Sequence, residues 1–289
     1  MAEERFVSVS GSGGAGEGVQ KIPSEKPSVL APSGLVSILI PCCGMLEYTK
    51  LCVPSVLRHS RPPFELIFID IGSLDGTAEY LSGLRTAAQV RVETVRTATD
   101  LGIPDAVKEA LRKARGEYLV LLNNDTVVTE YWLNQLIGLA TMSPTVGLIG
   151  PMSNYAGPPQ LVETVPYRTG PKKGSRATLD DGDALLNVQE VTAFAREFRE
   201  KHKGKWLEAG RLGGFCLLLK RQVLQKIEQF GSLDKWTDLS LFDTDILSAK
   251  ARQAGFTLAC CRDLFVHHFG TRTFAHGAPD GTSRKKEVT

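Results

Sequence analysis

The sequence has no long hydrophobic run and no surplus of charge of either sign. Its longest apolar stretches, such as 119–122 and 216–219, fall far short of the ~20 residues that a transmembrane helix needs. Lys plus Arg number 34 and Asp plus Glu number 32, whereas proteins that neutralise nucleic-acid phosphates carry a basic surplus or stripe. We therefore expect no transmembrane segment and no nucleic-acid partner.

The six cysteines lack the spacing of a metal site or a disulfide framework. No C-x-x-C pair is present, which argues against a zinc site. The vicinal pairs Cys42-Cys43 and Cys260-Cys261 lie in apolar runs typical of small core residues. The N-terminus also lacks the apolar stretch of a secretory signal. Together these features predict a reduced, cytoplasmic setting.

The two ends of the chain differ in composition from its middle. Residues 1–34 are rich in Gly, Ser and Pro, with Phe6 as their one aromatic residue, which predicts a flexible arm. Residues 276–289 are similarly polar and are expected to form a flexible tail. The remaining residues, 35–275, have the length of one large α/β domain.

Short apolar runs alternate with helical patterns through the first half of this domain. The runs at 36–40, 66–69, 118–122 and 146–149 are typical of strands buried on both faces. Apolar residues recur at helical spacing over 103–114, between the second and third runs. Strands separated by helices favour parallel pairing, so we expect a doubly wound α/β sheet. Further helices are expected near 188–198, 221–230 and 243–254, after a long excursion at 157–186.

Polar side chains follow three of the expected strands where each one ends. The first strand leads into Pro41, the second ends at Asp70, and the third is followed by Asn123-Asn124-Asp125. Each group alone is ordinary turn chemistry, but ligands bind at the carboxyl ends of strands in open α/β sheets. The three together predict a rim that holds a nucleotide base and a metal-bridged diphosphate. The lack of a G-x-G-x-x-G after the first strand argues against a dinucleotide-dependent dehydrogenase, which shares this kind of sheet.

The order of the motifs resembles a known family. VSILIPCCG (36–44), ELIFIDIGSLDGT (65–77), KARGEYLVLLNNDTVV (113–128) and FDTDILSAKARQAGF (242–256) together resemble family 2 glycosyltransferases of the GT-A fold, over about 36–274. The resemblance implies a Rossmann-like, mostly parallel central sheet flanked by helices, with an acceptor-side lobe. It also implies a nucleotide-sugar-binding half at 35–150 and an acceptor half at 151–275.

The resemblance assigns several residues to the nucleotide-sugar donor. Pro41 and Asp70 would hold the nucleotide. Asp100 and Gly102 match the polar-x-Gly motif of the family that lines the donor sugar. Ile71 stands where many relatives carry a second Asp or Asn, which leaves the base open. Arg272 would neutralise charge on the diphosphate, with a surface arginine as the alternative.

In this resemblance Asn123-Asn124-Asp125 occupies the place of the DxD motif of the family, as an NND variant of the bacterial type. Mg²⁺ is usually held by one or two carboxylates plus phosphates and waters, so Asp125 can suffice as the single carboxylate. The resemblance places a histidine nearby, and the register favours His268, with His267 as the alternative. Adjacent residues on a strand point to opposite faces, so one of the two would serve. Imidazole suits Mn²⁺ better than Mg²⁺; a capping or packing role remains open for each histidine.

In this family an acidic motif begins a helix that lies beneath the acceptor. The matching residues here are Phe242-Asp243-Thr244-Asp245. Asp243 takes the position of the catalytic base, with Asp245 in a supporting role, although a carboxylate there also caps a helix. Gly213 and Gly214 match small residues that border the acceptor, and a tight core contact explains them equally well. Within 147–160, Asn154 and Gln160 are candidates for contact with sugar hydroxyls, with a simple loop role as the favoured alternative.

The resemblance implies an inverting glycosyltransferase that uses a divalent metal, Mn²⁺ or Mg²⁺. It would move a sugar from a nucleotide-diphosphate sugar to a glycan or lipid-linked acceptor, in cell-surface polysaccharide or glycoconjugate synthesis. A lipid-linked acceptor would have to be met by peripheral contact with a membrane. The substitutions Ile71, Asn123 and Phe242 leave open a second class of function. In that class, a catalytically weak GT-A-like protein binds nucleotide sugar or glycan without turnover.

Overall fold

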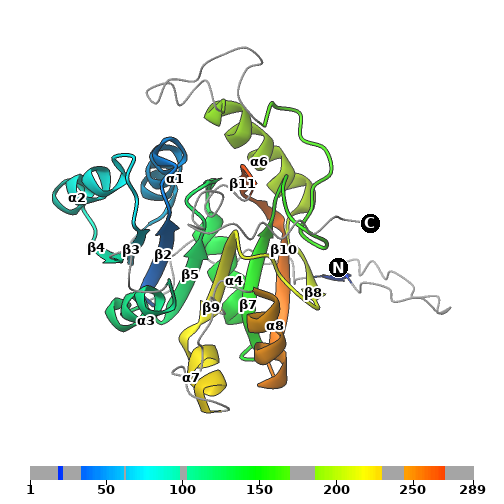
Figure 1. Cartoon of the computed structure of the whole chain (residues 1–289). Coiled ribbons are helices and arrows are strands. Elements are labelled where there is room, and N and C mark those ends of the chain that lie inside the picture. Colours follow the sequence, from blue (N-terminus) through cyan, green and yellow to red (C-terminus); the bar gives the residue numbers. More distant parts are fainter. Residues whose placement is uncertain are drawn as a thin grey trace, which may run out of the picture.

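The computed structural model describes residues 19–21, 34–61, 63–97, 103–169, 186–229 and 244–270. A nine-stranded sheet in the order β1-β8-β10-β7-β9-β5-β2-β3-β4 runs through the molecule, and β6 and β11 form a small second sheet (Figure 1). The strands are β1 (Val19–Lys21), β2 (Val36–Cys42), β3 (Phe64–Ile71), β4 (Val92–Thr97), β5 (Tyr118–Leu122), β6 (Thr126–Val127), β7 (Val146–Met152), β8 (Lys205–Ala209), β9 (Cys216–Lys220), β10 (Thr257–Phe265) and β11 (His267–His268). The helices are α1 (Leu46–His59), α2 (Thr77–Ala87), α3 (Ile103–Lys113), α4 (Trp132–Met142), α6 (Val188–His202), α7 (Arg221–Gln229) and α8 (Thr244–Gln253).

Most strands of the large sheet run in the same direction. β2 pairs in parallel with β3 and β5, β3 pairs in parallel with β4, and β7 pairs in parallel with β10. β9 lies between β5 and β7 and is antiparallel to both, and β8 is antiparallel to β10. The expected α/β fold with a central sheet flanked by helices is therefore confirmed. The expected halves at 35–150 and 151–275 share this sheet, because β9 inserts between two strands of the first half.

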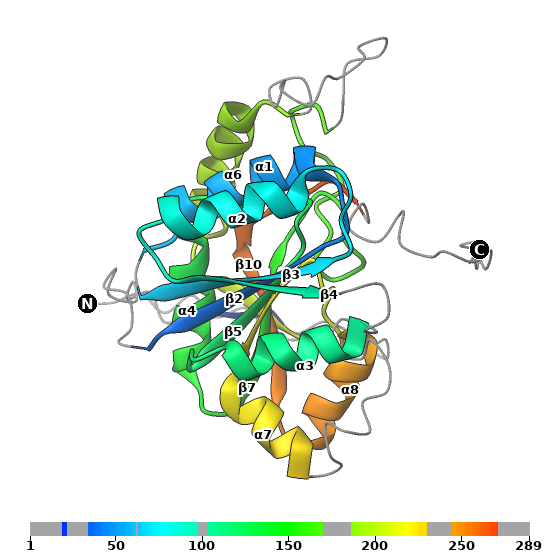
Figure 2. The same ribbon diagram turned by 60° about the vertical axis from the view of Figure 1, so that its left-hand side comes forward.

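The sheet is covered on both faces, which explains the continuous apolar runs of its central strands. Alternate residues of β2 face opposite layers: Ile38 and Ile40 pack in the layer that includes α1, α2 and α4, whereas Leu39 packs in the layer that includes α3, α7 and α8. The helices lie on the two sides of the sheet in Figure 2. The six cysteines are all unpaired, and all except the half-buried Cys43 are buried, as the sequence predicts.

The N-terminal segment differs from the expected flexible arm at three residues. Val19–Lys21 pair as β1 with the edge strand β8, in the register Gln20↔Trp206. An edge strand presents unpaired backbone groups that accept a further strand, so this short segment extends the sheet. The rest of 1–33 and the expected tail at 276–289 lie outside the described residues. No helix in the described part of the chain is long and apolar enough to cross a membrane.

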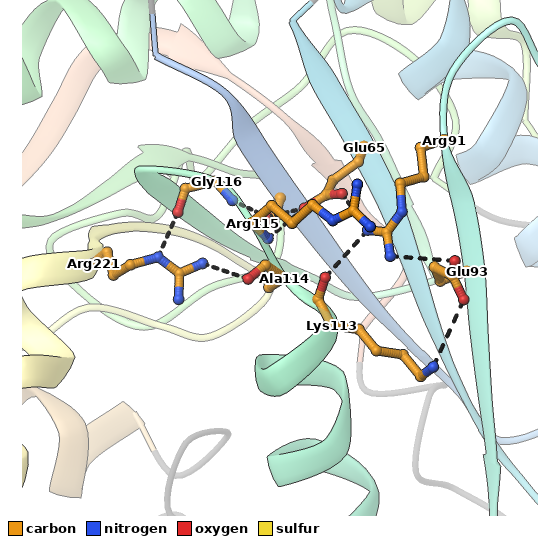
Figure 3. A network of polar contacts seen from close by, with 9 residues as sticks. Glu65, Arg91, Glu93, Lys113, Ala114, Arg115, Gly116 and Arg221 are labelled. Carbon is orange, nitrogen blue, oxygen red and sulfur yellow. Dashed lines mark hydrogen bonds and ion pairs between the residues drawn. The ribbon is translucent and has the colours of Figure 1, made fainter.

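A buried ionic network fixes the start of β5 at the amino-terminal edge of the sheet (Figure 3). The carboxylate of Glu65 accepts hydrogen bonds from Ser37 Oγ at 2.6 Å and from the backbone N–H of Arg115 at 2.7 Å, and it pairs with Arg91. Arg221 donates to two carbonyl groups of the same turn, at 2.6 and 2.9 Å. The network holds the turn between α3 and β5, and with it the strand that leads to Asn123.

Candidate functional site

The carboxyl ends of β2, β3 and β5 meet at one edge of the sheet, as the parallel pairing requires. Pro41 is the last residue but one of buried β2, and the next residue, Cys42, lies directly opposite Asp70 of β3. β5 pairs with the other side of β2, so the segment that follows it starts beside the same edge. The sheet thus brings Pro41, Asp70 and the segment 123–125 to one rim, as the sequence predicts.

Asp70 is fully buried and is engaged by the protein itself. One oxygen, Oδ1, accepts the backbone N–H of Ser73 at 3.0 Å and closes the turn after β3. The other, Oδ2, lies 3.3 Å from Nε of Arg96, the residue directly opposite on β4. Within the described residues, Oδ2 makes no hydrogen bond, so Arg96 is its charged neighbour at the rim.

The loops after β2 and β3 are tied to each other beside Asp70. The backbone N–H of Gly44 donates to Ser73 Oγ at 2.9 Å, and the N–H of Leu46, the first residue of α1, donates to Asp75 Oδ2 at 2.9 Å. Asp75 also accepts the hydroxyl of Thr77 at 2.6 Å. Burial alone would raise the pKa of Asp75, but the hydrogen bonds from Thr77 and Leu46 outweigh it and lower the pKa. Asp75 therefore stays ionised and stabilises the start of α1.

The two asparagines after β5 connect this rim to neighbouring segments. The backbone N–H of Asn123 donates to the carbonyl of Phe215, just before β9, at 2.9 Å. The buried amide of Asn124 donates to the carbonyl of Gly44 at 3.3 Å and to Thr49 Oγ1 at 2.9 Å. Asn124 thus holds the loop after β2 against the end of β5. Asp125, the next residue, is left in a fixed position at the rim.

Asp125 and His268 come together from opposite ends of the folded region. β11 pairs with β6 in the register His268↔Thr126, and Asp125 Oδ1 lies 3.4 Å from His268 Nε2. Both side chains are buried, at 0% and 5% exposure. The other ring nitrogen, Nδ1, lies 2.8 Å from the carbonyl oxygen of Tyr155. A carbonyl can only accept, so Nδ1 carries the proton and donates it to Tyr155.

That hydrogen bond turns Nε2 toward a carboxylate oxygen of Asp125, and in the neutral form of the ring Nε2 carries a lone pair. In that form two acceptors face each other in a buried place, and they repel unless a proton or a metal cation lies between them. Within the described residues, Nε2 has no hydrogen-bond partner. A histidine that donates one N–H to a carbonyl and presents the other nitrogen is the usual arrangement at metal sites. The pair Asp125 and His268 therefore fits a divalent cation.

His267 faces the other way, as alternation along a strand requires. Its Nδ1 lies 3.0 Å from the hydroxyl of Tyr167, and its ring packs edge-on against Phe269 with 4.6 Å between centroids. Burial, with a smaller contribution from His268, lowers the pKa of His267 to about 3, so the ring is neutral. Burial also raises the pKa of Tyr167. The structure thus places His267 in an aromatic cluster under α6 and His268 beside Asp125.

The residues expected on the acceptor side lie around the segment before β9. The N–H of Gly213 donates to Gln160 Oε1 at 2.6 Å, and Gln160 Nε2 donates to the carbonyl of Pro151 at 2.8 Å. Gln160 therefore joins the loop after β7 to Gly213, in the loop role that the sequence favours. Gly214 follows at a half-buried position. Asp245 is exposed in the first turn of α8, where its carboxylate lies 3.6 Å from Arg211.

Comparison with known families decides which family this chain belongs to. Residues 37–227 match the model described as "Glycosyl transferase family 2". The chain belongs to glycosyl transferase family 2. The resemblance in the sequence motifs is therefore confirmed at the level of the family.

Several relatives of this family 2 chain are named glycosyltransferases. An uncharacterized protein of Sinorhizobium fredii is 27% identical over 77% of this chain and 23% of its own length. The glycosyltransferase GlyG of Streptococcus pneumoniae is 25% identical over 43% of this chain and 40% of its own length. A putative teichuronic acid biosynthesis glycosyltransferase of Bacillus subtilis, TuaG, is 33% identical over 32% of this chain and 36% of its own length. The chain thus spans less than half the length of each of these relatives.

Solved structures share the fold of this family 2 chain. A mannosyltransferase from Pyrobaculum calidifontis, in complex with GDP-Man and Mn²⁺, has a TM-score of 0.55 at 18% identity, over 84% of this chain and 60% of its own. GalNAc-T7 with UDP, GalNAc and Mn²⁺ has a TM-score of 0.56 at 19% identity, over 86% of this chain and 45% of its own. At these identities the likeness shows the fold.

Some predicted site residues of the family 2 chain lie outside the described residues. These are Asp100, Gly102, Asp243 and Arg272. Of the others, the structure brings Pro41, Asp70 and the segment 123–125 to one rim. His268 lies beside Asp125. The carbonyl of Phe215, two residues after Gly213, accepts the N–H of Asn123.

Sequence reasoning missed Arg96, Tyr155 and Phe215 as neighbours of this site. Phe215 stacks on the ring of His268, with 5.2 Å between centroids and 16° between planes. Arg96 meets Asp70 through the register of two strands, and Tyr155 meets His268 across 113 residues. A signal for Arg96 exists in principle, because a charged residue near the end of a strand marks the same edge. No local pattern marks Tyr155, whose backbone makes the contact.

Proposed function

We propose that this family 2 chain is an inverting, metal-dependent glycosyltransferase. It moves a sugar from a nucleotide-diphosphate sugar to a hydroxyl of a glycan or lipid-linked acceptor. The observation that carries the proposal is the buried pair of Asp125 Oδ1 and His268 Nε2, 3.4 Å apart, at the rim where β2, β3 and β5 end. A carboxylate oxygen and an imidazole nitrogen that face each other at the carboxyl ends of these strands are two atoms of the kind that bind divalent metals.

Asp125 and His268 are the residues that would hold Mn²⁺ or Mg²⁺. Within the described residues, no cluster of three or more His, Cys, Asp or Glu side chains forms a complete metal site. Two protein ligands leave the other positions to phosphate oxygens and water. The metal would therefore bind together with the donor, and it would supply Lewis-acid stabilisation of the departing diphosphate. The Mn²⁺ in the two solved structures of this fold supports a divalent metal ion here.

The donor nucleotide would lie along the ends of β2 and β3. Asp70 would accept an N–H of the base on Oδ2, and Arg96, which is half exposed, would move away from that oxygen when the nucleotide binds. Pro41 borders the same edge, and Asp100 and Gly102 would line the sugar. Arg272 would stand near the diphosphate. These assignments rest on the family resemblance and on the position of the rim.

The acceptor would bind between the segment before β9 and the start of α8. Asp243, the residue before α8, would take the proton from the acceptor hydroxyl. As it does so, that oxygen bonds to the anomeric carbon and the bond from this carbon to the diphosphate breaks. Asp245 and the neighbouring Gly213 and Gly214 would border the acceptor. A direct attack of this kind inverts the anomeric centre, and alignment of the two substrates lowers its entropic cost.

The acceptor belongs, in this proposal, to cell-surface polysaccharide or glycoconjugate synthesis. The support is the likeness to TuaG, a putative glycosyltransferase of teichuronic acid biosynthesis, which matches 32% of this chain. A lipid-linked acceptor would be reached by peripheral contact with a membrane.

A screen of nucleotides tests the proposal and separates it from binding without turnover. We expect Mn²⁺ together with one of UDP, GDP, dTDP or CDP to raise the melting temperature above the effect of either alone. The corresponding nucleotide sugars should then be hydrolysed slowly when no acceptor is present. Stabilisation without any hydrolysis or transfer would instead favour the catalytically weak binding protein. No stabilisation by any pair would contradict both.

Replacing the proposed base tests the mechanism. Asp243→Asn should lower the rate of transfer by 10²-fold or more, because general-base catalysis contributes about 10²–10⁴-fold. Binding of nucleotide with Mn²⁺ should remain unchanged. Asp263→Asn is a control, because this carboxylate accepts the N–H of Gly204 elsewhere on the molecule. Transfer by Asp243→Asn at close to the wild-type rate would show that another group is the base.

A further inference from the structure

The backbone of His268 is held by one side chain from a distant segment. The amide of Asn154 donates from Nδ2 to the carbonyl of His268 at 2.9 Å and accepts its N–H on Oδ1 at 3.0 Å. The two bonds join a side-chain amide to both polar groups of a single residue, 114 positions along the chain. Such a pair fixes the position and the orientation of the His268 backbone.

The next residue, Tyr155, fixes the ring that this backbone carries. Its carbonyl accepts the N–H of His268 Nδ1 at 2.8 Å, and its ring meets the His268 ring edge-on, with 5.5 Å between centroids. Gly270 packs over the Tyr155 ring so closely that a Cβ there would lie 3.1 Å from three ring atoms. Consecutive residues therefore determine where His268 lies and which of its nitrogens carries the proton.

The segment that carries these two residues is anchored at both ends. Ser153 donates its N–H to the carbonyl of Gln160 at 2.8 Å and accepts the N–H of Val162 at 2.8 Å. The carbonyl of Met152 accepts the N–H of Val266 at 3.0 Å, which ties the end of β7 to the chain just before β11. The position of Asn154 is thus set by the sheet and not by a free loop.

We propose that Asn154 is a positioning residue for the metal site. It holds the His268 backbone so that the Tyr155 carbonyl selects the tautomer with Nδ1 protonated, which turns the lone pair of Nε2 toward Asp125. This role rests on the proposed function, since the metal is what that lone pair serves. It differs from the contact with sugar hydroxyls that the sequence suggested, because both ends of the Asn154 amide bind His268.

The tautomer of His268 can be measured without any metal. In ¹⁵N-labelled, metal-free protein at about pH 8, where an ordinary histidine is neutral, the wild-type ring should show a protonated Nδ1 and an unprotonated Nε2. His268→Gln identifies which of the five histidine signals belongs to this ring. Asn154→Ala should give averaged shifts from both tautomers. Asn154→Asp, which can accept the His268 N–H but cannot donate to its carbonyl, should fall between the two.

Mn²⁺ provides the second readout, because its unpaired electrons broaden the signals of nearby nuclei. The wild-type His268 ring signals should broaden at the lowest Mn²⁺ concentration, ahead of the other histidines. Asn154→Ala should need about tenfold more Mn²⁺ for the same broadening, as expected for the loss of a residue that orients a ligand.

Asn187→Ala is the matched control. The Asn187 side chain also accepts two backbone hydrogen bonds, from Gln189 and Glu190 at the start of α6. This variant should lose stability and leave both His268 readouts as in the wild type, so a mere loss of stability cannot imitate the predicted result.

The outcomes separate the inference from the proposed function. A wild-type ring that Mn²⁺ does not broaden selectively would overturn the metal site, and the inference with it. Selective broadening in the wild type, with the same Mn²⁺ dependence and the same tautomer in Asn154→Ala, would overturn the inference alone.

Discussion

At the scale of single residues, two adjacent histidines occupy different environments. His268 stacks on Phe215 and faces Asp125, whereas His267 bonds to Tyr167 within an aromatic cluster. The difference follows from the alternation of side chains along β11. Its consequence is that one ring faces a carboxylate and the other contributes to packing.

Substitution of each histidine separates these roles. His268→Gln should abolish the Mn²⁺-dependent part of the stabilisation by nucleotide, because Gln lacks the imidazole lone pair. His267→Phe should keep that part, and should lower the free energy of unfolding by about 1–3 kcal/mol, because the buried hydroxyl of Tyr167 loses its partner. Melting curves with and without Mn²⁺ and nucleotide measure both effects. The reverse pattern, with metal dependence lost only in His267→Phe, would assign the ligand to His267.

The sequence indicates where the site residues stand in the chain, but not what they contact. Asp70 can be placed at the end of a strand because an apolar run precedes it. Its contact with Arg96 depends on the register between β3 and β4, which no local pattern encodes. The same holds for Asn154, whose partner lies 114 residues away. Residue types and spacing therefore predict the chemistry of the site, and only the folded chain shows which groups are already occupied.

At the scale of elements, Glu65 joins three segments at the start of β3 and β5. Its carboxylate accepts from Ser37 and from the backbone of Arg115 and pairs with Arg91 (Figure 3). Burial alone would raise the pKa of Glu65, but the hydrogen bonds from Ser37, Arg115 and Arg91 outweigh it and lower the pKa. The ionised form is thus favoured by folding.

Loss of the Glu65 charge should lower the free energy of unfolding, and it should make that free energy depend less on pH. Glu65→Gln should lower the free energy of unfolding by about 1–3 kcal/mol at neutral pH, since buried donors lose an ionised acceptor. Because the folded pKa is lowered, the ionised Glu65 contributes fully above the unfolded value of about 4.3 and less as the pH falls toward the folded pKa. Denaturant unfolding from pH 6 to about 3 should therefore show the gap between wild type and variant shrinking.

Glu93→Gln is the control for this network, because Glu93 pairs with Arg91 and Lys113 at a partly exposed position. It should change the free energy of unfolding by about 0–1 kcal/mol. A loss as large as that of Glu65→Gln, or a gap that stays constant with pH, would contradict the role of Glu65.

Elements with continuous apolar runs could be predicted, and those with mixed patterns could not. The runs at 36–40, 118–122 and 146–149 form β2, β5 and β7, which are buried on both faces. β4 and β8 escaped prediction because exposed or half-buried residues interrupt the buried ones along them. β4 ends the sheet, and β8 lies next to the short strand β1 at the other end. A strand that is buried on both faces has a continuous apolar run that predicts it, whereas a strand near the edge of the sheet has a mixed pattern that does not.

At the scale of the whole molecule, the order of strands assembles the site. β9 crosses from the second half into the sheet between β5 and β7. The segment before it therefore meets Asn123 through the carbonyl of Phe215, and the Phe215 ring meets His268. The sequence resemblance implies a donor half and an acceptor half, but the insertion of β9 between strands of the first half could not be predicted from it, because strand order follows from packing across the whole chain.

The central claim is that Asp125 and His268 bind a divalent metal together with a nucleoside diphosphate. Calorimetric titration of nucleotide at a fixed Mn²⁺ concentration tests it most directly, with wild type, Asp125→Asn and the control Asp263→Asn compared. We predict that Mn²⁺ strengthens nucleotide binding to the wild type and to Asp263→Asn by at least about tenfold, which is 1.4 kcal/mol. Asp125→Asn should bind nucleotide equally weakly with and without Mn²⁺. If Asp125→Asn retains the full Mn²⁺ effect, the metal does not bind at this pair and the account is wrong.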